Sequence, residues 1–196
     1  MAKAFFENDV FFIDERVAFL KFTNSYKIFD EDGNQIGNVQ QKMSGGYKLL
    51  SFFLSKAMFP LNLDIADIDG NVLISLRRGW SFLLSKISIM DERGKHIADI
   101  SQKFKLLKAE FQILDAAGAQ VGKILGDWKA WNFTITDNRD KEIGIITKKW
   151  AGILKEAFTS ADKYIVSVKP ELSDMTKRKA VIASAIVIDM ILKESS

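Results

Sequence analysis

The amino-acid sequence predicts a mainly β protein, in which antiparallel hairpins close into a barrel around a buried hydrophobic helix near the C-terminus. Two observations lead to this fold class. The pattern apolar-x-apolar-x-Asp-x-x-Gly-x-x-apolar-x-x-apolar occurs five times along the chain, and a nearly uninterrupted apolar run follows the last copy. A repeated pattern of this length indicates a repeated supersecondary unit. Five hairpins need a partner for their inner faces, and closing them around the apolar run also removes exposed sheet edges.

Each copy of the pattern has the chemistry of a β-hairpin. The alternating apolar residues before the aspartate give a strand with one buried face. An aspartate at the first turn position hydrogen-bonds to its own backbone, and a glycine three residues later adopts the left-handed conformation that closes a type I turn through a bulge. Asp140 replaces glycine in the fifth copy, and aspartate tolerates this conformation better than most residues. The turn aspartates are Asp30, Asp67, Asp91, Asp115 and Asp137, and the glycines are Gly33, Gly70, Gly94 and Gly118.

The return strand of each hairpin departs from simple alternation. Its two apolar anchors are three residues apart rather than two, as in Ile36 and Val39 of the first copy. One extra residue in a strand resets the alternation, so we expect a β-bulge in each return strand. Short helices are the alternative, but the preceding period-2 strands and the β-branched residues disfavour them.

The C-terminal apolar run predicts a helix at residues 177–193. Only Ser184 and Asp189 interrupt the apolar residues from Ala180 to Leu192. A helix that is apolar on all sides is either a membrane span or buried in the protein. The run covers about 20 Å, and a span needs to cross about 30 Å, so we favour a central core helix. Asp189 is then either hydrogen-bonded near the helix end, which we favour, or a functional carboxylate inside the barrel.

Composition indicates one intracellular domain, residues 1–196. The chain has 196 residues, two prolines, no low-complexity linker and a net charge of +3. It has no cysteine, which excludes disulfides, thiol catalysis and thiolate metal sites. The first ten residues have no secretory signal pattern, because Lys3, Glu7 and Asp9 interrupt their apolar stretch. The mild basic excess permits an anionic partner without requiring one.

The sequence resembles a known family in several segments. Residues 148–162 contain Trp-Ala-Gly followed by Lys-Glu-Ala-Phe-Thr-Ser-Ala-Asp. This is similar to the Trp-Ser-Gly and Arg-Glu-Ala-Phe-Thr-Asp-Ala-Asp of the phospholipid scramblases. Residues 185–194 resemble the final hydrophobic helix of that family, including its Ile-Asp. The earlier hairpins resemble the LURP-one-related proteins equally well, and the similarity covers about residues 20 to 194.

This resemblance implies the tubby C-terminal fold, a closed barrel of about twelve antiparallel strands threaded by a C-terminal helix. Five hairpins provide ten strands, and Val17–Phe22 and Tyr164–Val168 are the expected remaining two. The resemblance also implies a non-enzymatic protein that associates with membrane phospholipid, with lipid scrambling as a further activity.

The calcium segment of the scramblases is altered in this chain. Ser160 and Ser173 stand where that family has carboxylates. Of the acidic positions Asp162 remains, with Glu171 as a second one, and Asp162 is the weak calcium candidate. Calcium prefers six to eight oxygen ligands, usually with several carboxylates. We therefore expect no cofactor and no metal. The turn aspartates are explained by their turns rather than by a metal site.

Catalysis is not expected, because the inventory of catalytic side chains is poor. His96 is the only histidine and lies in a turn, and the glycines, one per hairpin, form no phosphate loop. Basic–aromatic clusters at the hairpin ends are the better functional candidates, since Trp favours the lipid headgroup zone and Lys and Arg attract anionic lipid. The alternative is a solvated strand end whose Trp packs inward. The predicted lipid-binding residues are Arg77, Arg78, Trp80, Lys148, Lys149 and Trp150.

Two main hypotheses for function remain from the sequence, and a third, an enzyme or ligand carrier that uses the barrel interior, is weakened if the helix fills that interior. The first is a cytoplasmic protein, peripheral at the membrane, whose partner is anionic phospholipid. The second is a soluble regulatory or nucleic-acid-binding module, which the basic pairs permit although no helix-turn-helix or basic helix is present.

Overall fold

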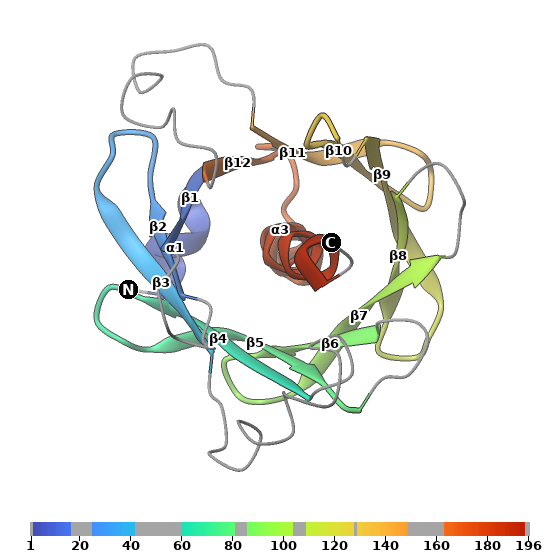
Figure 1. Ribbon diagram of the computed structural model, residues 1–196, viewed down its shortest axis with the longest axis horizontal. Helices are drawn as coiled ribbons and strands as arrows, with labels where there is room; N and C mark the ends of the chain where they lie inside the picture. The colour runs from blue at the N-terminus through green and yellow to red at the C-terminus, as the bar shows by residue number, and fades with distance from the viewer. Residues whose placement is uncertain are drawn as a thin grey trace.

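A computed structural model describes residues 2–16, 25–41, 60–80, 86–103, 109–127, 129–148 and 163–194. Twelve antiparallel strands form a closed barrel, and a long helix lies inside it (Figure 1). The helices are α1 (Ala2–Glu7) and α3 (Met175–Glu194), and the strands are β1 (Val10–Arg16), β2 (Ser25–Phe29), β3 (Gln35–Gln41), β4 (Leu61–Asp67), β5 (Val72–Arg78), β6 (Lys86–Asp91), β7 (His96–Lys103), β8 (Ala109–Asp115), β9 (Gln120–Asp127), β10 (Asn132–Asp137), β11 (Glu142–Thr147) and β12 (Lys163–Val168).

The predicted fold class is confirmed by the strand order. Each strand pairs with its neighbours in the chain, and β1 pairs with β12 to close the barrel. The strand expected at Tyr164–Val168 is β12. The strand expected at Val17–Phe22 lies outside the described residues, and the strand that completes the twelve is β1. Phe11, Phe12 and Ile13 are all fully buried, so β1 begins with a continuous apolar run, Val10–Ile13, without the alternation that identified the other strands.

The five predicted turns form as expected. In the first, the Asp30 carbonyl accepts a hydrogen bond from the Gly33 N–H at 3.2 Å, and Asp30 Oδ1 accepts from the backbone N–H groups of Asp32 and Asn34 at 3.1 and 2.8 Å. The same bonds form around each of the other four turn aspartates. The four turn glycines have φ between 76° and 88°, and Asp140 adopts φ 60° in the fifth turn.

A bulge is present in each return strand, as the spacing of the anchors predicts. In the first hairpin, Ile28 pairs with Gly37 and Phe29 pairs with Gln35, which leaves Ile36 as the extra residue. Each of the other four hairpins has a register shift at the equivalent place. The extra residue is the first of the two anchors in every copy, so the three-residue spacing is the sequence signature of the bulge.

Helix α3 is the core of the barrel. It begins two residues before the predicted 177–193 and ends one residue after it. Every side chain from Ala180 to Ile191 is buried. The Tyr26 hydroxyl donates a hydrogen bond to Asp189 Oδ2 at 2.9 Å, so the prediction that Asp189 is hydrogen-bonded near the helix end is confirmed. Within the described residues, no helix combines the length and the apolarity needed to cross a membrane.

The two ends of the barrel differ, and we name them the turn end and the loop end. The turn end contains the five Asp turns and the first turn of α3. There, Arg178 of α3 pairs with Asp9 at 2.6 Å, and Lys179 forms an ion pair with Glu92 in the β6–β7 turn. The loop end contains the opposite strand ends and the C-terminal end of α3. Six connections join strand ends at the loop end: residues 17–24, 42–60, 79–85, 104–108, 128–131 and 148–162.

Candidate functional site

The barrel topology brings the predicted basic–aromatic positions to one end of the molecule. Strand β5 ends at Arg78 and β11 ends at Thr147, and both of these strand ends lie at the loop end. Five strands separate β5 from β11 in either direction around the barrel. The cluster at residues 77–80 and Lys148, the described residue of the second cluster, therefore lie on opposite sides of one barrel mouth. The structure gathers them on one end without forming a single compact site.

Charge is divided between the two ends. The sequences of the six connections at the loop end contain ten lysines and two acidic residues. The five turns, from each Asp to the residue four positions later, contain ten acidic residues, two lysines and two arginines. The connections thus have a net charge of +8 and the turns a net charge of −6.

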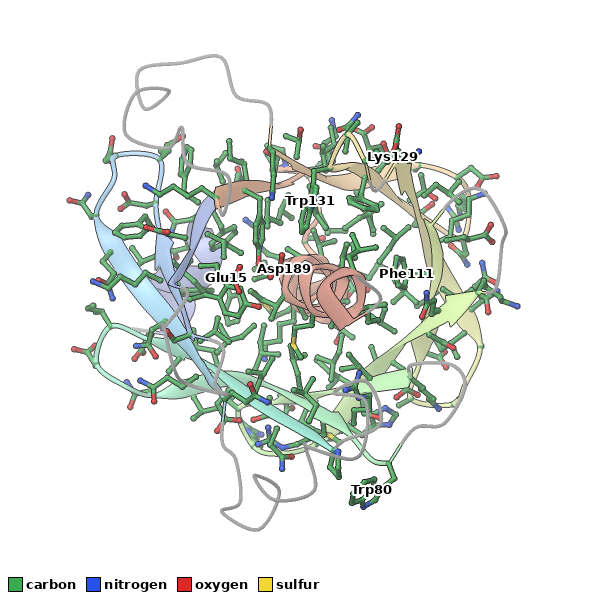
Figure 2. All side chains as sticks on the ribbon, viewed as in Figure 1. Glu15, Trp80, Phe111, Lys129, Trp131 and Asp189 are labelled. Atoms are coloured by element: carbon green, nitrogen blue, oxygen red, sulfur yellow. The ribbon has the colours of Figure 1, made fainter. Side chains whose placement is uncertain are left out.

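Tryptophan follows the same division. All four tryptophans of the chain, at positions 80, 128, 131 and 150, belong to the six connections at the loop end. Trp80 is 47% exposed and extends outward from the barrel, whereas Trp131 lies over the barrel interior (Figure 2). Lysine with exposed tryptophan is the residue combination found at membrane–water interfaces.

Arg77 and Arg78 differ from simple exposed cations. An Arg77 Nη atom lies 2.7 Å from Asp64 Oδ1, and its other Nη donates to the Leu63 carbonyl at 2.9 Å. Ser75 also donates to Asp64 Oδ1, at 2.7 Å. Arg78 is only 5% exposed. Within the predicted cluster at residues 77–80, Trp80 is therefore the exposed member, and Arg77 is held against the outer face of the barrel.

Lys148 continues a stack of aromatic rings that leads into the barrel. Its Nζ lies 4.2 Å from the centroid of the Trp131 ring, and this ring stacks on Tyr164 with centroids 5.5 Å apart. Burial, with the nearby Asp189 carboxylate and Tyr26, raises the pKa of Tyr164 well above its ordinary value. The Tyr164 hydroxyl is therefore neutral at physiological pH. Lys148, Trp131 and Tyr164 thus form a row of contacts that leads from the loop end toward the buried Asp189 of α3.

Three of the predicted residues, Lys149, Trp150 and Asp162, lie outside the described residues. Within the described part of the chain, no three or more acidic or histidine side chains come together as a metal site. The further loop-end cations Lys103 and Lys129 are described and exposed.

The stacked residue Trp131 was missed from the sequence. Trp128-Lys129-Ala130-Trp131 is a basic–aromatic cluster of the kind recognised at residues 77–80, and its position at a hairpin end is the signal that could have identified it. Trp131 also has φ 47°, and its carbonyl accepts a hydrogen bond from the Lys148 N–H at 3.1 Å.

His96 contacts a serine–aspartate pair on the outer face of β6 and β7. The Ser88 hydroxyl donates to Asp99 Oδ1 at 2.6 Å, and His96 Nε2 lies 3.0 Å from the same oxygen. Lys86 Nζ lies 2.9 Å from the second oxygen of Asp99. In a catalytic triad the histidine lies between the serine and the carboxylate. Here the carboxylate lies between the serine and the histidine, so this cluster does not activate the serine as a nucleophile.

Comparisons with known proteins identify the relatives of this chain. A family model with the description Scramblase matches residues 11–194. The chain is similar to "Altered inheritance rate of mitochondria protein 25" of Saccharomyces cerevisiae, with 23% identity over 167 residues, covering 73% of this chain and 51% of that protein. It is also similar to human "Phospholipid scramblase family member 5", with 27% identity over 148 residues, covering 68% of this chain and 54% of that protein.

A solved structure supports the fold. An X-ray structure of an Arabidopsis thaliana protein matches with a TM-score of 0.57 and 11% identity, covering 93% of this chain and 91% of that one. This similarity supports a tubby-like fold for the chain. The chain spans about half the length of the curated relatives that it matches.

Proposed function

Because the chain belongs to the scramblase family, we propose that it is a non-enzymatic protein that associates with anionic phospholipid surfaces through the loop end of its barrel. The observation that supports this most strongly is the separation of residue types along the barrel. All four tryptophans and ten lysines belong to the connections at the loop end, and the opposite turns are acidic.

The physical basis is the combination of charge and amphipathic rings. Each Lys or Arg close to an anionic membrane contributes about 1 kcal/mol, which corresponds to about a fivefold change in affinity. The half-exposed Trp80 ring provides a group that favours the headgroup region. With the loop end on the membrane, the acidic turn end faces away from it, so one orientation is favoured over its reverse.

Calcium is not required in this proposal, because attraction between cationic side chains and anionic lipid needs no bridging metal. Asp162 is the weak candidate from the sequence, and calcium is therefore a variable of the experiment. Transbilayer movement of lipid is a separate activity, which requires its own assay. Helix α3 fills the barrel with apolar side chains, which disfavours a route for polar headgroups through the barrel interior.

The experiment is flotation of the purified protein with neutral and with anionic vesicles, at low and high salt, with calcium or with chelator. We expect binding to anionic vesicles only, weakened by salt and unaffected by calcium. Binding to both vesicle types that survives high salt would contradict an electrostatic surface association. No flotation in any condition, with salt-sensitive binding to duplex DNA, would favour the nucleic-acid-binding alternative.

Matched variants locate the contact surface. Lys103→Gln and Lys129→Gln together remove two exposed charges at the loop end, and about a 25-fold loss of vesicle affinity is expected from about fivefold per lysine. Lys95→Gln and Lys141→Gln remove two lysines from the turn end and should not weaken binding. Trp80→Ser tests how much the Trp80 ring contributes to vesicle binding. An equal loss for both lysine pairs would contradict the assignment of the loop end.

A further inference from the structure

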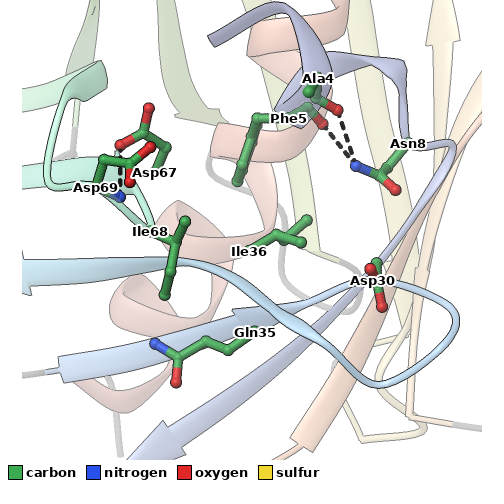
Figure 3. A pocket seen from close by; sticks show the side chains of 9 residues that line it. All are labelled: Ala4, Phe5, Asn8, Asp30, Gln35, Ile36, Asp67, Ile68 and Asp69. Carbon is green, nitrogen blue, oxygen red and sulfur yellow. Dashed lines mark hydrogen bonds between the residues drawn. The ribbon is translucent and has the colours of Figure 1, made fainter. Parts of the chain in front are cut away.

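A pocket of about 330 Å³ lies at the turn end, on the opposite side of the molecule from the proposed membrane contact. It lies between α1, the β2–β3 turn and the β4–β5 turn and is open to solvent on one side (Figure 3). Phe5, Ile36 and Ile68 give it apolar walls, and its carboxylates are Asp30, Asp67 and Asp69. None of the lining residues that the structure describes is a lysine or arginine. The pocket is therefore both acidic and apolar.

Ile68 is exceptional when the five repeated turns are compared. The same turn position is Glu31, Glu92, Ala116 or Asn138 in the other four hairpins. The turn chemistry requires no apolar residue there, since hydrogen bonds to the preceding aspartate form in every copy. Ile68 is nevertheless 57% exposed at the edge of the pocket. Ile68 therefore adds an exposed apolar side chain to the pocket lining, where a ligand in the pocket can cover it.

The Asp67 carboxylate of the pocket is ionised at neutral pH. Burial alone would raise the pKa of Asp67, but hydrogen bonds from the Asn71 side chain, the Asn71 N–H and the Asp69 N–H hold it below its ordinary value. Those bonds occupy the Asp67 carboxylate within its own turn. Asp69 is an exposed turn residue. Its carboxylate can accept a hydrogen bond from a ligand without breaking the turn.

We propose that this pocket binds an arginine side chain of a partner protein, with an adjacent apolar residue of the partner covering Ile68. A guanidinium group carries its charge on a plane that suits carboxylates, and its aliphatic stem suits the walls formed by Phe5 and Ile36. A volume of about 330 Å³ is at the small end of ligand pockets. A small amine inside it would leave Ile68 uncovered, whereas a peptide segment covers both. This inference does not depend on membrane binding.

The experiment uses the protein with ¹³C-labelled isoleucine methyl groups, observed by NMR. The probes are acetyl-Leu-Arg-amide, its neutral counterpart acetyl-Leu-citrulline-amide, and butylguanidinium. We expect the arginine dipeptide to shift the Ile36 and Ile68 methyl signals in a saturable way, with a dissociation constant of about 1 mM. The citrulline dipeptide should bind more weakly because it has no charge, and butylguanidinium should bind more weakly because it has no leucine to cover Ile68. Raised salt should weaken the binding of the arginine dipeptide.

Variants of exposed turn residues separate the two parts of the proposed contact. Asp69→Asn should lower the affinity for the arginine dipeptide about two- to fivefold, as expected for a solvent-exposed ion pair. Ile68→Ser should reduce the difference between the dipeptide and butylguanidinium. Asp140→Asn makes the same carboxylate-to-amide change in a turn outside the pocket and should have no effect. Ala116→Ile creates an apolar turn tip away from this pocket and should create no new binding.

Two results would overturn the proposal. Equal affinity for the arginine and citrulline dipeptides would eliminate the carboxylates as the recognition element. Affinity for butylguanidinium equal to that for the dipeptide, unchanged by Ile68→Ser, would assign the pocket to a small cation rather than to a protein segment. Absence of saturable shifts with every probe would show that the pocket is not a binding site for this chemistry.

Discussion

Replacing Ile186 by alanine tests whether α3 is the structural core of the domain. The side chain is 0% exposed and belongs to the main hydrophobic cluster. The substitution removes three carbon atoms, which corresponds to roughly 2.4 kcal/mol at about 0.8 kcal/mol per methylene. A cavity inside a closed barrel adds to this, so we expect a loss of about 2.5–5 kcal/mol. Equilibrium urea unfolding, followed by tryptophan fluorescence and circular dichroism, measures it.

A matched control lies in the same helix. Met175 is the first residue of α3 and is 44% exposed, so Met175→Ala should cost less than about 0.5 kcal/mol. Ile186→Asp should give no folded domain, because it buries a charge with no partner. A loss below about 1 kcal/mol for Ile186→Ala, similar to that of the Met175 control, would refute the assignment of α3 as the core.

Three further predictions concern polar groups and the turns. Tyr26→Phe removes the donor to buried Asp189 and should cost about 1.5–3 kcal/mol in urea unfolding. Tyr164→Phe removes a buried hydroxyl that has no hydrogen-bond partner among the described residues and should change stability by less than about 0.5 kcal/mol; equal costs would contradict this. Gly118→Ala should lower stability by about 1–2 kcal/mol because φ is 85°, although the added methyl meets open space; an unchanged melting temperature would contradict the strain. Burial would raise the pKa of Asp99, but hydrogen bonds from a serine, a lysine and a histidine hold it below its ordinary value of 3.8. The stability from Asp99 is therefore present above pH 3.8 and lost as pH falls below it, and Asp99→Asn should reduce this acid dependence in unfolding curves measured from pH 7 to pH 2.

The hairpins could be predicted from the sequence because their chemistry is local. A turn aspartate, a glycine or Asp140 three residues later and the three-residue anchor spacing are all contained within one hairpin, and the structure confirms turn and bulge together. The core helix could be predicted from its length and its lack of a polar face. Strand β1 was missed because its apolar run lacks the alternation and the turn pattern used to identify the others.

Side-chain environments at the candidate site depended on pairing between strands. The sequence identified Arg77 and Arg78 as cations at a strand end. Asp64 becomes the partner of Arg77 because Arg77 lies opposite Asn62, which places Asp64 diagonally across the strand pair. The contact of Lys148 with Trp131 likewise depends on the pairing of β10 with β11. A pattern along one strand does not contain this information.

The order of elements in the chain has a consequence for synthesis. Helix α3 follows all twelve strands, and the contacts that close the barrel join β1 to β12. A ribosome therefore releases every hairpin before the segment that covers their apolar inner faces. In the nascent chain, the local turns can form early. The hydrophobic core cannot form until about the last twenty residues of this domain emerge. Premature termination before Met175 would leave five amphipathic hairpins without a core, which is a substrate for chaperones and proteases rather than a smaller barrel.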